Sequence, residues 1–107
     1  MRIPKRFKIY GQTIEVVYNG DVFIEKDECV GFASYRLNQI QIRPSQESCP
    51  RSNSQLEVTF LHELVHFILF YAQSARDKEK EWMHQDENFV ESFSNLLHQA
   101  LTTFEYE

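Results

Sequence analysis

The sequence predicts an α+β domain in which a small antiparallel or mixed β-sheet is followed by two packed helices. The first half of the chain alternates polar and apolar residues, as half-buried strands do, whereas the second half repeats apolar residues at helical spacing. A length of 107 residues with 42% hydrophobic residues suits one packed core. We therefore expect a single domain over residues 1–107.

The first two expected strands form a hairpin. Phe7–Tyr10 and Thr13–Tyr18 are rich in β-branched and aromatic residues and flank Gly11-Gln12, which we expect to form the turn. The charged segment Val22–Glu28 favours an exposed strand or a loop.

Two further strands follow. Cys29–Arg36 is expected to be a strand in which Gly31 forms a bulge or a turn. Leu37–Arg43 alternates regularly, and Pro44 ends it. In this last strand we expect two isoleucines to face the core and two glutamines to face away from it: Ile40, Ile42, Gln39 and Gln41.

A long helix is expected after the strands. Ser54-Gln55-Leu56-Glu57 has the pattern of a capping box and predicts its start, and neither Pro nor Gly occurs in residues 52–76. Apolar side chains recur there at helical spacing and predict its buried side: Leu56, Phe60, Leu64, Phe67, Ile68 and Tyr71.

A second helix is expected to begin after the N-cap Asp86. Its apolar stripe is interpreted as core: Phe89, Val90, Phe93, Leu96, Leu97, Ala100, Leu101 and Phe104. The intervening charge run, Arg76–Glu81, is interpreted as a solvated helix end or loop.

Composition excludes several classes of partner. The net charge of -5 argues against a nucleic-acid-binding surface and against attraction to anionic lipid, so neither nucleic acid nor membrane is expected. Met1–Arg6 is too polar for a signal peptide. We interpret Cys29 and Cys49 as reduced thiols, because their spacing matches neither a disulfide framework nor a metal motif. The expected location is cytoplasmic.

The most informative motif is His62-Glu63-Leu64-Val65-His66, an H-E-x-x-H sequence within the first expected helix. Histidines four residues apart project from one side of a helix and can share a tetrahedral metal ion. Glu63 lies about 100° around the helix from His62, where a carboxylate can reach a metal-bound water without being a ligand. The motif predicts Zn²⁺ at His62 and His66, with Glu63 as the catalytic base.

A catalytic zinc site needs a third protein ligand. The downstream candidates are Glu79, Glu81, His84, Asp86, Glu87, Glu91 and His98. Glu87 and Glu91 are favoured because they lie one turn apart on one side of the helix that should pack across the motif. One carboxylate would bind zinc and the other would hold a ligand histidine through its second ring nitrogen. Glu91, His84 and His98 are alternatives to Glu87 as the ligand.

His62-Glu63-x-x-His66 followed by Glu87-x-x-x-Glu91 resembles the gluzincin pattern of zinc metallopeptidases. Residues 52–101 are similar to small phage- and prophage-associated metallopeptidases, some of which cleave repressors. The resemblance implies that Glu87 is the third zinc ligand and that Glu91 orients a histidine from the second shell. It also implies packing roles for Phe93, Leu96 and Leu97. Glu91 stands where the family usually has Asp or Asn.

The implied function is zinc-dependent hydrolysis of a protein or peptide. The strand Asn38–Ile42 is expected to be an exposed sheet edge that pairs with the substrate, with Gln39 and Gln41 contacting it. Tyr35 and Tyr71 are candidates for the group that stabilises the oxyanion, but no motif places either of them. Two alternatives have other functions: a non-catalytic zinc-binding or protein-interaction module of phage or prophage origin, and a structural phage protein.

Overall fold

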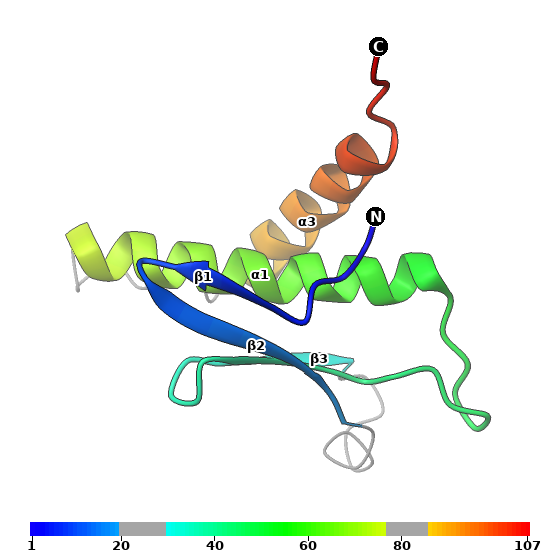
Figure 1. Cartoon of the computed structure of the whole chain (residues 1–107), viewed down its shortest axis with the longest axis horizontal. Coiled ribbons are helices and arrows are strands. Elements are labelled where there is room, and N and C mark those ends of the chain that lie inside the picture. Colours follow the sequence, from blue (N-terminus) through cyan, green and yellow to red (C-terminus); the bar gives the residue numbers. More distant parts are fainter. Residues whose placement is uncertain (20–29, 77–85) are drawn as a thin grey trace.

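The computed structural model describes residues 1–19, 30–76 and 86–107. These residues form a four-stranded mixed sheet followed by two helices, which confirms the predicted α+β class. The elements are β1 (Arg6–Ile9), β2 (Gln12–Tyr18), β3 (Gly31–Ser34), β4 (Gln39–Ile42), α1 (Asn53–Arg76) and α3 (Glu87–Thr102). Figure 1 shows α1 between the sheet and α3. The expected segment Val22–Glu28 lies outside the described residues.

β1 and β2 form the predicted antiparallel hairpin, with a turn one residue earlier than expected. Ile9 pairs with Gln12, so the two-residue turn is Tyr10-Gly11 rather than Gly11-Gln12. Tyr10 and Gly11 have φ angles of 52° and 72°. Positive φ at both central residues is typical of the type I′ turn, whose twist matches that of the flanking strands.

The strand order β1-β2-β4-β3 places β4 inside the sheet and β3 at its edge. β4 pairs in parallel with β2 and antiparallel with β3, so strands occupy both of its sides. The expectation that Gln39 and Gln41 belong to an exposed edge strand is therefore wrong. Their polarity has another cause: they lie on the sheet face opposite Ile40 and Ile42, which are fully buried as predicted.

The core lies between this inner sheet face and α1. Alternate residues of β2 and β4 meet apolar side chains of one side of the helix, as a half-buried sheet requires. The buried cluster consists of Ile14, Val16, Ile40, Ile42, Phe60, Leu61 and Phe67. Phe67 is fully enclosed, and the edge of its ring contacts Tyr35 with ring centroids 5.1 Å apart.

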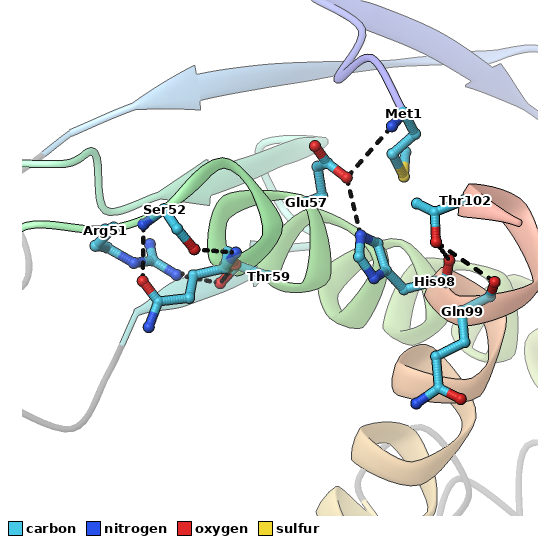
Figure 2. Close-up of polar contacts among 9 residues, drawn as sticks. Met1, Arg51, Ser52, Glu57, Thr59, His98, Gln99 and Thr102 are labelled. Carbon is cyan, nitrogen blue, oxygen red and sulfur yellow. Dashed lines mark hydrogen bonds and ion pairs between the residues drawn. The ribbon is translucent and has the colours of Figure 1, made fainter.

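α1 begins with a capping box, but not the one expected. The Ser52 amide donates to Gln55 Oε1 at 2.8 Å, and the Gln55 amide donates to Ser52 Oγ at 3.1 Å. Ser52, labelled in Figure 2, and Gln55 thus replace Ser54 and Glu57 as the reciprocal pair. The sequence contains both patterns, Ser-x-x-Gln and Ser-x-x-Glu, two residues apart, and Glu57 has a different partner.

That partner is His98 of α3. Its ring Nε2 lies 2.8 Å from Glu57 Oε1, and the amino group of Met1 lies 3.3 Å from the same oxygen (Figure 2). The hydrogen bond with His98 lowers the pKa of the Glu57 carboxyl. The pair ties α3 to α1.

α3 starts as predicted, because the Asp86 side chain accepts a hydrogen bond from the Phe89 amide. Only part of its apolar stripe is covered. Val90 is buried, and Leu97 and Leu101 pack against the core. The remaining expected core residues are exposed, so those assignments are wrong, including the packing roles implied for two of them: Phe89, Phe93, Leu96, Ala100 and Phe104. Among the described elements, α3 packs mainly on α1, and one helix is too narrow to cover the whole stripe.

Within the described ranges, neither helix has the length and apolarity needed to cross a bilayer.

Phe67 and Ile68 are neighbours in α1 that differ in burial, so replacing each of them tests how α1 packs on the sheet. Phe67→Ala should lower the free energy of unfolding by about 3–5 kcal/mol, because it empties a fully buried aromatic site. Ile68→Ala removes a side chain that is 46% exposed and should cost less than about 1 kcal/mol. Urea unfolding followed by circular dichroism measures both values. Equal losses for the two variants would contradict this packing.

Candidate metal centre

The H-E-x-x-H residues lie in the middle of α1, which is helical without interruption through the motif. The His62 and His66 rings lie on successive turns, with centroids 5.0 Å apart. Glu63 and His66 are buried, with exposed fractions of 5% and 7%, while His62 is half-buried. One acidic and two imidazole side chains therefore gather at one place on the helix, and their potential ligand atoms lie within 4.8 Å of one another.

Glu87, the first residue of α3, brings a carboxylate to both imidazoles. Its Oε2 lies 3.0 Å from His62 Nε2, and its Oε1 lies 2.8 Å from His66 Nε2. The two helices thus converge on a single point, since the same carboxylate contacts both ring nitrogens. The Glu87 side chain is itself 66% exposed, so this point opens to solvent on the α3 side.

These three side chains fit a divalent metal ion. In a tetrahedral site with bonds of about 2.0–2.1 Å, neighbouring ligand atoms lie about 3.3–3.4 Å apart. The nitrogen–oxygen distances of 2.8 and 3.0 Å fall a few tenths of an ångström short of this, so a slight separation of the side chains admits an ion. Two imidazoles and a carboxylate are also donors that suit a first-row metal such as zinc.

Glu63 lies farther from His62 than Glu87 does. Its Oε1 is 4.0 Å from His62 Nε2. Burial, and secondarily the negative charge of Glu87, raise the pKa of its carboxyl to about 8. A carboxylate with a raised pKa takes up a proton more readily than an exposed one. A bound cation would act in the opposite direction and favour the charged form.

A cavity of about 760 Å³ opens over the four side chains. β3 and the adjoining residues form one wall, α1 forms the floor, and α3 forms the other wall. The lining residues are Val30, Gly31, Phe32, Ala33, Tyr35, Val58, Thr59, His62, Glu63, His66, Glu87, Glu91 and Asn95. The cavity therefore joins the candidate metal point to the edge strand of the sheet.

Gly31 allows β3 to lie against α1 at the cavity. A Cβ atom at this position would stand 2.6 Å from Thr59 Cγ2 and 3.2 Å from Glu63 Cγ. Gly31 is thus neither a bulge nor a turn but a regular strand residue that permits close backbone approach. The Arg51 guanidinium also links α1 to the start of β3. It donates to the Thr59 hydroxyl in α1 and, at 3.5 Å, to the carbonyl of Val30, the residue before β3.

The structure brings some of the other expected site residues near the metal point and not others. Glu91 lines the cavity one turn after Glu87. The hydrogen bonds described for Glu91 use its backbone carbonyl, which accepts from Ser94 Oγ and Asn95 Nδ2, so its histidine-orienting role stays a prediction. Gln39 and Gln41 hydrogen-bond to each other at 3.3 Å and do not line this cavity.

Two alternatives for the third ligand have different outcomes. His98 is paired with Glu57 and does not line the cavity around the metal point. His84 lies outside the described residues, as do Glu79, Glu81 and Cys29. Cys49 is a free thiol, and the expected reduced state of the two cysteines stays a prediction.

Gly31→Ala tests the contact between β3 and α1. The added methyl group overlaps the Thr59 side chain, so the free energy of unfolding should fall by about 1–3 kcal/mol. Thr59→Ser removes the methyl group that Gly31→Ala would strike but keeps the hydroxyl. Gly31→Ala should therefore cost measurably less in a Thr59→Ser background. An equal cost in both backgrounds, measured by urea unfolding, would show that this close approach is absent.

Comparison of the chain with protein-family models, with curated proteins and with solved structures gives no match. The functional argument therefore rests on the residues of the site.

Proposed function

We propose that this protein is a zinc-dependent metallopeptidase with a minimal zincin architecture, acting on a protein or peptide. The observation that carries the proposal is the position of the Glu87 carboxylate, 3.0 and 2.8 Å from the Nε2 atoms of His62 and His66. A buried acid, Glu63, lies next to this point. Phage origin and a cytoplasmic location stay predictions.

His62, His66 and Glu87 are the residues that would hold the metal. Zinc bound there would lower the pKa of its water to about 7 and polarise the substrate carbonyl. Three protein ligands leave one tetrahedral position for water or substrate, which is typical of catalytic zinc sites, whereas structural sites have four protein ligands. This is the reason to favour hydrolysis over the alternative of a non-catalytic zinc-binding module.

Glu63 would move the proton. Its carboxylate accepts the proton of the attacking water and then delivers it to the nitrogen of the departing amine. Glu63 lies in the cavity floor, where burial favours its protonated form and a bound cation would favour its charged form. A structural metal site would not need an acid beside two ligand histidines, so Glu63 supports catalysis in particular.

The substrate would bind along β3. β3 pairs with β4 on one side only, in the part of the chain that the structure describes. Residues 30–33 line the cavity, so a peptide added to the other side of β3 would cross the metal point. In this proposal β3 replaces the strand with Gln39 and Gln41 as the substrate-binding element.

Metal binding is the first test. Equilibrium dialysis with zinc, followed by elemental analysis, should find about one ion per chain. His62→Ala and Glu87→Ala should each weaken binding by more than the roughly 10–100-fold expected for loss of an outer-shell partner. Glu105→Ala changes an exposed acid that follows α3 and does not line the cavity, so it should keep the affinity. Unchanged affinity in His62→Ala would exclude this metal site.

Hydrolysis is the second test. Zinc-loaded wild-type protein should cleave members of a fluorogenic peptide library, while Glu63→Gln should retain zinc and lose at least about 10²–10⁴-fold in kcat/KM. Glu91→Gln changes another acid of the same cavity and serves as the matched control, since it should leave a larger residual activity. Full activity in Glu63→Gln, or loss of zinc from it, would contradict the role given to Glu63.

A further inference from the structure

Tyr35 is a polar side chain of the cavity to which no role has been given above. It directly follows β3 and lines the same cavity as His62, Glu63 and Glu87. Tyr71, the other candidate, does not line this cavity, and its hydroxyl donates a hydrogen bond to Asn38 Oδ1 at 3.0 Å. The structure therefore separates two tyrosines that the sequence leaves equivalent.

The Tyr35 ring is held firmly. It stacks on Phe70 with ring centroids 4.2 Å apart and an interplanar angle of 7°, and it meets the edge of Phe67. Both phenylalanines belong to α1, and Phe70 lies one turn after His66. The ring is thus fixed to the same helix that carries the two histidines. A fixed ring places its hydroxyl without reorganisation during a reaction, which is what electrostatic catalysis requires.

The Tyr35 hydroxyl is also a hydrogen-bond donor at neutral pH. Burial raises the pKa of the phenol above its ordinary value, and the negative charges of Glu63 and Glu87 raise it further. Tyr35 lines the same cavity as Glu63 and Glu87, so its side chain borders the space over the metal point. A neutral donor there is complementary to a substrate oxygen that becomes negative, and it would gain strength in a cavity shielded from water.

We propose that Tyr35 is a catalytic residue that donates a hydrogen bond to the carbonyl oxygen of the scissile peptide bond as that oxygen becomes an oxyanion. The assignment rests on the function proposed above and names the donor that it lacks. Water oxygen bonds to the carbonyl carbon, the carbonyl π pair moves onto oxygen, and the water proton moves to Glu63. When the C–N bond breaks, the nitrogen takes the proton from Glu63. Tyr35 keeps its own proton throughout.

Tyr35→Phe removes the hydroxyl and keeps the ring stack. Zinc-loaded Tyr35→Phe should bind a phosphinic pseudo-tripeptide with Phe and Ala side chains about 10²–10³-fold more weakly than wild type, because its tetrahedral anion imitates the oxyanion. Acetohydroxamate, which is planar, should bind both proteins alike. In the peptide assay kcat should fall by a similar factor with little change in KM. Zinc affinity should stay unchanged.

Tyr71→Phe is the matched control, since it deletes a phenol hydroxyl near α1 outside the cavity, and it should keep phosphinate affinity and kcat. Wild-type values for Tyr35→Phe, with Glu63→Gln inactive, would overturn the assignment of Tyr35 and leave the proposed peptidase intact. Equal losses in Tyr35→Phe and Tyr71→Phe would also overturn it, as a general packing effect. A wild-type protein that binds zinc but neither cleaves peptides nor binds the phosphinate would overturn both proposals.

Discussion

The carboxylate of Glu87 contacts both imidazoles of the motif, and this contact depends on how α3 packs on α1. Each helix alone carries an incomplete set of groups. Glu87 ties the beginning of α3 to His62 and His66, while His98 ties the helix to Glu57 eleven residues later, about 16 Å along the axis. Val90 and Ser94, which are buried, lie between these two polar anchors. A metal ion at the first anchor would therefore stabilise the docking of the helices as well.

Much of the fold can be predicted from local patterns. Alternation places Ile40 and Ile42 in the core, and Asp86 predicts the start of α3. The strand order cannot be predicted in this way, because alternation identifies the face of a residue and not the neighbours of its strand. For this reason the polar residues of β4 predict a free edge, whereas the strand lies inside the sheet. The exposed residues of α3, such as Phe93, could not be predicted either, because apolar periodicity does not give the number of elements that cover a helix.

The candidate site likewise contains residues that sequence motifs predict and residues that only tertiary packing brings there. Four of its residues belong to spaced motifs, and the structure brings those four together: His62, Glu63, His66 and Glu87. Tyr35 and Gly31 belong to no motif, because they reach the site through the pairing of β3 with β4 and its packing on α1. Gly31 is the one residue whose type points to this packing. Its presence predicts a bulge or a turn, but in the structure it lets the backbone of β3 lie close to α1. The wall of the cavity that β3 and Tyr35 form therefore depends on contacts between residues far apart in the sequence, which local patterns do not predict.

X-ray absorption at the zinc edge of the zinc-loaded protein tests the central claim most directly, because it reports the atoms around the ion. We expect four nitrogen or oxygen neighbours at about 2.0–2.1 Å, together with outer-shell scattering from two imidazoles that decreases when either His62 or His66 is replaced. Sulfur neighbours at about 2.3 Å, or a shell without imidazole scattering, would contradict it. Either result would mean that the two helices converge on this point for another reason.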